Sequence, residues 1–125
     1  MPPINNISPV GWYLVSYLLR FTDRRDKDND NDEKRFLSWE NTILVKADDT
    51  DHAYDKAMKI ALQATKPYRG GPKGVPVQWK LVGITDVLPI YEELEDGNEI
   101  AWAERAPRKL QNLKKMVYPK ARFRQ

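Results

Sequence analysis

The sequence predicts an α+β fold, in which an antiparallel sheet of about four strands, in the chain order β-β-α-β-β, carries one packed helix and is followed by a basic C-terminal helix. Three observations predict it: alternating apolar residues before position 47, a stripe of small residues at helical spacing after it, and renewed alternation from position 75. With 125 residues, 41% of them hydrophobic, the chain can bury one ordinary core. We therefore expect a compact domain over residues 1–104 and a basic tail over residues 105–125.

Two strands are expected near the start of the chain. In residues 12–21 every second side chain is large and apolar, namely Tyr13, Val15, Tyr17, Leu19 and Phe21. The opposite face is mixed, so this strand is expected to be largely buried. Residues 36–47 alternate apolar with polar side chains and predict a half-buried strand. Between them the polar loop, residues 22–35, is almost wholly charged or polar, which indicates a solvated hairpin connection.

A helix is predicted to begin near Thr50, because the acids of residues 48–51 can cap it and lie at the positive end of its dipole. Its inward stripe consists of small or aliphatic residues: Ala53, Ala57, Ile60, Ala61 and Ala64. Such a narrow stripe favours close packing against a sheet. Pro67 and the turn at residues 70–72 end the helix.

Alternation resumes at residues 75–81, which predict a third strand that opens beside Pro76. Gly83 and Pro89 interrupt the apolar run that follows. Because both residues weaken regular strand pairing, we expect residues 84–91 to form a bend and a short irregular segment.

The C-terminal part predicts a turn, a last strand and a helix. Residues 95–98 read Glu-Asp-Gly-Asn, a strong turn signal. The fourth strand is expected at residues 99–104, with Ile100 and Trp102 on one face. Residues 108–117 predict a basic amphipathic helix, whose apolar stripe is Leu110, Leu113 and Val117.

Charge is distributed unevenly along the chain. Residues 1–104 contain all 18 acidic residues and 13 of the 21 Lys and Arg residues, for a net charge of −5. The remaining residues contain eight basic side chains and no acidic one, for a net charge of +8. A tail of this charge can bind a polyanion, bind a protein partner or fold back onto its own acidic body.

The polar loop invites comparison with a calcium-binding loop. Asp26, Asp28 and Asp30 have the first three ligand spacings. Asn31 and Leu37, however, occupy the positions that require glycine and a bidentate glutamate. We therefore expect a solvated loop and no metal site.

No other motif predicts catalysis or a cofactor. The absence of cysteine removes disulfides, thiolate metal ligands and thiol nucleophiles. His52, the single histidine, has no identifiable nucleophile or substrate group beside it and is interpreted as a surface residue. Residues 69–74 are glycine-rich and basic but lack the flanking strand, helix and hydroxyl of a phosphate loop. We expect no catalytic residue and no cofactor.

Two charged clusters are the candidate binding surfaces. The candidates for a protein contact surround the predicted turn: Glu92, Glu93, Glu95, Asp96 and Glu99. A solvated acidic patch is the alternative, because no apolar pocket is indicated that would raise the pKa of one carboxyl group for acid-base catalysis. The candidates for a nucleic-acid or tail contact are Arg108, Lys109, Lys114, Lys115, Lys120, Arg122 and Arg124. Tyr118 and Phe123 lie among them and could stack on bases. Docking of the tail on its own body through the apolar stripe is the competing interpretation.

Several segments together resemble one protein family. They are Gly11-Trp12-Tyr13-Leu14, Trp39-Glu40-Asn41, Ala47-Asp48-Asp49 followed by residues 52–57, and the segment from Leu81 to Ile100. The last is the most specific, because its Gly, Pro and Asp-Gly punctuation is an unusual combination. Over residues 11–103 the chain thus resembles domain of unknown function 4288, a small uncharacterised bacterial family. The resemblance implies a compact α+β domain and no established activity, and the polar loop and basic tail lie outside the matching segments.

These observations predict a non-enzymatic module that binds another macromolecule. A protein partner is favoured, nucleic acid is the alternative, and the oligomeric state stays open. One concrete form is a bacterial immunity or inhibitor-type protein, because an acidic surface suits the capture of a basic protein. The longest apolar stretches are too short to span a membrane and the first residues lack the basic flank of a signal peptide, so we expect a cytoplasmic protein without membrane contact.

Overall fold

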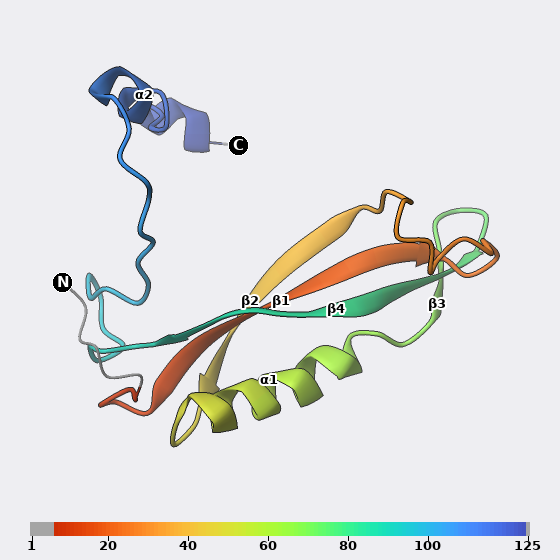
Figure 1. Ribbon diagram of the computed structural model, residues 1–125, viewed down its shortest axis with the longest axis horizontal. Helices are drawn as coiled ribbons and strands as arrows, with labels where there is room; N and C mark the ends of the chain where they lie inside the picture. The colour runs from red at the N-terminus through yellow and green to blue at the C-terminus, as the bar shows by residue number, and fades with distance from the viewer. Residues whose placement is uncertain (1–6, 125) are drawn as a thin grey trace.

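The computed structural model describes residues 7–124, and its centre is a four-stranded antiparallel sheet with one helix packed across one face (Figure 1). The strands are β1 (Trp12–Asp23), β2 (Ser38–Lys46), β3 (Tyr68–Gly70) and β4 (Val75–Pro89), and their order in the sheet is β2-β1-β4-β3. The helices are α1 (Thr50–Gln63), α2 (Leu110–Lys114) and the short 3₁₀ helix η1 (Lys120–Phe123). The predicted α+β class and the chain order β-β-α-β-β are confirmed.

The core lies between α1 and one face of the sheet. Asp49 caps α1 by accepting a hydrogen bond from the backbone N–H of His52 at 2.8 Å, so the helix begins where it was predicted. Ala53, Ala57 and Ala61 are completely buried, and their methyl groups let the helix approach the strands closely. The sheet contributes Tyr13, Val15, Tyr17, Leu19, Val45 and Val77 to the same core. Each large apolar side chain removed from water contributes about 1.5–3 kcal/mol to folding.

β4 continues as one strand to its last residue, so the predicted bend and irregular segment is wrong for residues 84–89. The pairing of β4 with β1 shifts twice, and these β-bulges leave Val82 and Thr85 without a partner in the register. Each bulge reverses the faces on which alternate residues lie. Consequently three residues spaced by three, rather than by two, pack toward the core: Leu81, Ile84 and Val87.

The fourth strand is not where the sequence placed it. Residues 99–104 form no strand, and Ile100 and Trp102 are exposed, so the predicted fourth strand there is wrong. The fourth strand is instead the short β3, which pairs with residues 75–77 of β4 across a tight connection. Gly71 and Gly74 of this connection have φ angles of 71° and 61°, a left-handed conformation that glycine adopts without strain.

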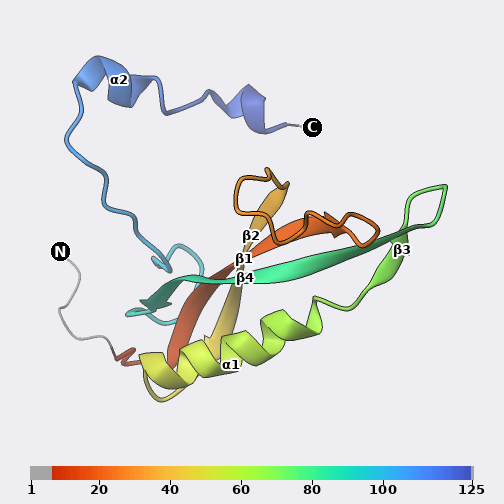
Figure 2. The same cartoon turned by 45° about the vertical axis from the view of Figure 1, so that its right-hand side comes forward.

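The basic tail stands apart from the sheet. It leaves the molecule at the end where β1 begins and β4 ends, and α2 and η1 lie away from the face that α1 covers (Figures 1 and 2). The polar loop and β3 occupy the opposite end of the sheet (Figure 1). The helix predicted over residues 108–117 is shorter in the structure, where α2 spans only the five residues Leu110–Lys114. In the described part of the chain, no helix combines the length and apolar character needed to cross a membrane.

Candidate functional site

The acidic loop, residues 92–99, brings the five predicted acidic residues together on one short segment. Its backbone is held by hydrogen bonds within the loop: the N–H of Asn98 donates to the Glu95 carbonyl at 3.1 Å, and the Asn98 side chain donates to the Glu93 carbonyl at 3.0 Å. These bonds confirm the turn predicted at residues 95–98. Gly97 has a φ angle of 84°, which allows the chain to reverse there.

The acidic side chains of the loop are exposed to solvent. All five acids are exposed: Glu92, Glu93, Glu95, Asp96 and Glu99. Glu92 has a structural role, because its carboxylate accepts a hydrogen bond from the backbone N–H of Glu99 at 2.7 Å. Leu94 and Ile100, within and beside the loop, are also exposed. The arrangement is a preformed acidic surface with apolar side chains among and beside its charges.

The basic tail carries its charges on a segment that does not pack on the sheet. Every predicted contact residue is exposed: Arg108, Lys109, Lys114, Lys115, Lys120, Arg122 and Arg124. None of them, nor Arg105, forms an ion pair with another residue in the range 7–124. The four cations from Arg108 to Lys115 lie in and around α2, and the other three lie in and around η1.

The apolar stripe of the tail is also free. Leu110, Leu113 and Val117 have exposed fractions of 65%, 41% and 72%, so the tail is not docked on the body through them. The contacts of the tail are internal: the guanidinium of Arg122 lies 4.1 Å from the ring centre of Tyr118, whose ring packs edge-on against Phe123. The tail is therefore an exposed segment whose helix α2 contacts neither the sheet nor α1.

The polar loop is held by ion pairs and does not gather its carboxylates. Arg25 forms a two-pronged contact with Asp23, with N–O distances of 3.0 and 2.8 Å, and this hydrogen bonding lowers the pKa of Asp23 from 3.8 to about 2. A side-chain hydrogen bond from Lys34 lowers the pKa of Asp26, and the backbone N–H of Asp28 adds to the effect. Within residues 7–124 no three His, Cys, Asp or Glu side chains are grouped closely enough to hold a metal ion.

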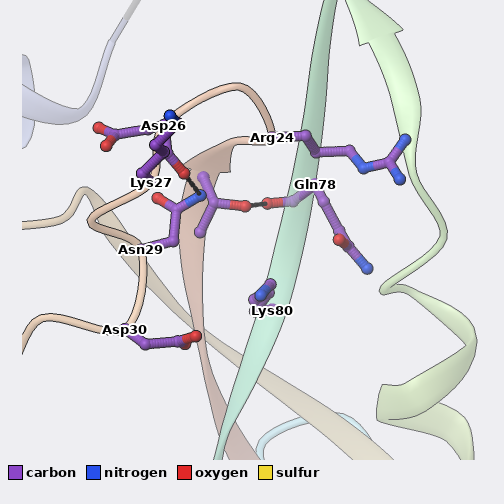
Figure 3. Close-up of a pocket in the computed structure, with 8 residues that line it drawn as sticks. Arg24, Asp26, Lys27, Asn29, Asp30, Gln78 and Lys80 are labelled. Atoms are coloured by element: carbon purple, nitrogen blue, oxygen red, sulfur yellow. Dashed lines mark hydrogen bonds between the residues drawn. The ribbon is translucent and has the colours of Figure 1, made fainter.

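An open pocket of about 310 Å³ lies between the polar loop and β4 (Figure 3). Its lining is entirely polar and consists of Thr22, Arg24, Asp26, Lys27, Asn29, Asp30, Gln78 and Lys80. The side-chain amide of Gln78 donates a hydrogen bond to the Thr65 carbonyl at 2.8 Å. The guanidinium of Arg24 points away from Lys80, so the cations do not converge on one point (Figure 3). The geometry is that of a solvated surface pocket.

His52 has a local structural role. Its Nδ1 atom accepts a hydrogen bond from the backbone N–H of Asp48 at 3.1 Å, beside the N-terminus of α1. The surrounding shallow pocket is lined by Gly11, Lys46, Ala47 and Lys56 together with Asp48 and His52 themselves, so it contains no serine, threonine or tyrosine hydroxyl. Through this hydrogen bond the histidine stabilises the connection between β2 and α1.

Sequence reasoning missed the exposed aromatic side chain of β2. Trp39 belongs to the apolar side of the alternation that predicted a half-buried strand at residues 36–47, yet 57% of its surface is exposed. Its ring lies 5.1 Å from that of Trp79, which in turn packs against Phe21. Edge position alone does not account for this, because Val45 on the same face of β2 is 2% exposed. The missing information was which part of β2 packs against α1: Val45 and Ala47 share the core with Ala53 and Ala57, and Trp39 does not.

Comparison with known proteins identifies the family of the chain but no characterised relative. A search of curated proteins and a search of solved structures each found no match. A family model, described as Domain of unknown function (DUF4288), matches residues 12–102, which include β1, β2, α1, β3, β4 and the acidic loop. The match leaves the basic tail outside the family model. Because it spans well over half of the sequence, the chain belongs to the DUF4288 family.

Proposed function

We propose that this protein is a non-enzymatic module that binds another protein through the acidic loop and the basic tail. The observation that carries the proposal is that the acidic loop lies at one end of the sheet and the oppositely charged tail leaves the molecule from that same end, with the charged side chains of both exposed and neither segment packed on the core. Charged side chains on a surface accelerate association and select the partner by complementarity. Neither segment is needed to complete the core, so both are free to serve recognition.

The acidic loop is suited to a basic protein surface. Its hydrogen bonds hold the backbone in one conformation, so little conformational entropy is lost when a partner binds. Leu94, exposed among the acids, supplies apolar contact area next to the charges. This combination supports an immunity or inhibitor-type role, in which an acidic surface captures a basic protein.

The apolar stripe of the tail favours a protein partner over nucleic acid. Phosphate contacts require only the cations, and they leave Leu110, Leu113 and Val117 in water. A protein groove that is apolar at its floor and acidic at its rim would contact both kinds of side chain. The acidic body also repels a polyanion that approaches the tail. The aromatic pair Tyr118 and Phe123 is the observation that supports nucleic acid as the second candidate.

The test compares two variants of equal charge. Glu93→Lys/Glu95→Lys/Asp96→Lys inverts the acidic loop but keeps the backbone carbonyls and the Glu92 carboxylate that hold its shape. The matched control inverts three exposed acids of the polar loop, which lies at the other end of the sheet: Asp28→Lys/Asp32→Lys/Glu33→Lys. A protein captured by the wild-type chain should associate at least about tenfold more slowly with the first variant and show a weaker salt dependence.

Equal binding of that protein by both variants would refute a role for the acidic loop. The nucleic-acid candidate is tested separately with single-stranded and duplex DNA and RNA of random sequence. Tight binding that loses about 0.7–0.9 log units of affinity per phosphate contact for each tenfold rise in salt, and that disappears when residues 105–125 are removed, would replace the protein-partner proposal.

A further inference from the structure

The outer edge of β2 has an unpaired backbone. Two hydrogen bonds at its ends show which residues direct their backbone groups toward β1. The Phe21 N–H donates to the Leu37 carbonyl at 2.9 Å, and the Ala47 N–H donates to the Gly11 carbonyl at 3.0 Å. Odd-numbered residues of β2 therefore direct their N–H and C=O groups toward β1, and even-numbered residues direct theirs outward. On the outer side, the one hydrogen bond between described residues runs from Lys56 Nζ to the Lys46 carbonyl at 2.9 Å. A carbonyl oxygen has two lone pairs, so this one can still accept a second hydrogen bond from another strand.

This edge lacks the proline, the bulges and the covering strand that protect the other edge of the sheet. The free edge of β4 has two bulges and ends in Pro89, and its first residues are covered by β3. β2 has neither a proline nor a bulge over its nine residues. Trp39 and Leu44, on opposite faces beside this edge, are 57% and 46% exposed. A regular edge strand with outward-pointing backbone groups and exposed apolar side chains is a template for another strand.

We propose that two copies of the chain associate by antiparallel pairing of β2 with β2 of the second copy, in the register that sets Glu40 opposite Lys46. These are the only two charged residues of β2, and they have opposite signs. Both are even-numbered, so their backbone groups point outward and their side chains share the face of the sheet that α1 leaves uncovered. Antiparallel pairing places Glu40 of each copy beside Lys46 of the other copy, which forms two equivalent ion pairs about a twofold axis.

The same register suits the rest of the strand. Thr42 meets Leu44 of the second copy through outward backbone groups, and Ile43 faces its own counterpart on the axis. The exposed ring of Trp39 comes to lie opposite Ala47 of the second copy. A register shifted by two residues also matches the backbone alternation, but it sets Glu40 opposite Leu44 and leaves both charges without a partner. The two sheets would join into one continuous sheet with both α1 helices on the same face.

The first test measures the mass of the full-length chain by light scattering over a range of concentrations. The wild type should approach twice the monomer mass of 14.6 kDa. Thr42→Pro removes an outward N–H, which an edge strand tolerates in the monomer, and should raise the dimer dissociation constant at least about tenfold. Thr42→Val is the matched control, because it loses the same 2.8 Å hydroxyl contact with Ser16 but keeps the N–H, and it should stay dimeric.

The second test examines the register. Glu40→Lys alone and Lys46→Glu alone each set like charges opposite one another twice and should raise the dissociation constant roughly tenfold, whereas the double variant restores two ion pairs and should recover the dimer. A wild type that is monomeric at every concentration would overturn the proposal. So would a dimer that neither Thr42→Pro nor either single charge reversal weakens. Because these variants lie outside the acidic loop and the tail, failure here leaves the proposed partner binding untouched.

Discussion

The body of the protein and its basic tail differ in where they place their apolar side chains. β1, β2, β4 and α1 each bury side chains in a shared core, whereas α2 and η1 bury none. The tail is nevertheless rich in large apolar residues, among them Leu110, Val117 and Phe123. Since these residues contribute no core packing, they are accessible for the partner contact that we propose. Folding stability is therefore expected to depend on residues 12–90, and binding on residues beyond them.

The largest difference in unfolding free energy is expected when the same tyrosine-to-alanine substitution is made once in the body and once in the tail. Tyr13→Ala removes a completely buried ring, whose hydroxyl accepts the backbone N–H of Ser8 at 2.9 Å, and should lower the free energy of unfolding by about 3–5 kcal/mol. Tyr118→Ala, the same substitution in the tail, should change it by less than about 0.5 kcal/mol. Urea unfolding followed by tryptophan fluorescence measures both. Similar losses for the two variants would show that the tail is part of the cooperative fold.

Removal of the whole tail gives the next test of the comparison. Truncation after Glu104 should leave the free energy of unfolding unchanged within about 0.5 kcal/mol, because the removed apolar residues are already in water. The docked arrangement that the sequence left open predicts instead a loss of about 1–3 kcal/mol. Calorimetric melting of the full-length and truncated chains distinguishes the two, and a clear fall in melting temperature would contradict the structure of the tail.

The smallest effect concerns the polar loop, which belongs to the body but faces water. The Asp23 carboxyl should titrate near pH 2 in the folded protein, because Arg25 stabilises its charged form. Since the folded pKa is depressed, any stability from this pair is present above the unfolded pKa of about 3.8 and is lost as the pH falls toward 2. Carbon-detected NMR titration should show the pKa of Asp23 returning toward 3.8 in Arg25→Gln and staying low in the control Arg24→Gln.

The elements that followed a simple local rule were predictable from sequence. Alternation located β1 and β2, and the acids before Thr50 located the start of α1, because an N-cap and a small-residue stripe are signals within a few residues of each other. The far half of β4 was missed because its facing pattern depends on bulges, which exist only in relation to β1. β3 is too short to carry any alternation of its own, and only its pairing with Val75–Val77 defines it.

The charges of the candidate surfaces were predictable, whereas their surroundings were not. Acid and base positions can be read from composition, and the turn at residues 95–98 follows from its Asp-Gly pair. Whether Leu113 is covered or free depends on the path of the whole tail, and no local pattern determines that path. The exposure of Trp39 likewise depends on which part of β2 packs against α1, which is a property of the assembled fold.

The two bulges of β4 have a consequence for how the length of the chain can vary. Val82 and Thr85 are both exposed and have no partner in the register with β1. Deleting either one would straighten the strand at that point and leave every remaining side chain on its present face. Deleting a paired residue such as Val87 would instead move the side chains on one side of the deletion to the opposite face of the sheet, unless the position of a bulge shifted to compensate. β4 thus contains two residues, Val82 and Thr85, whose deletion leaves the core-facing side chains in their present pairing with β1.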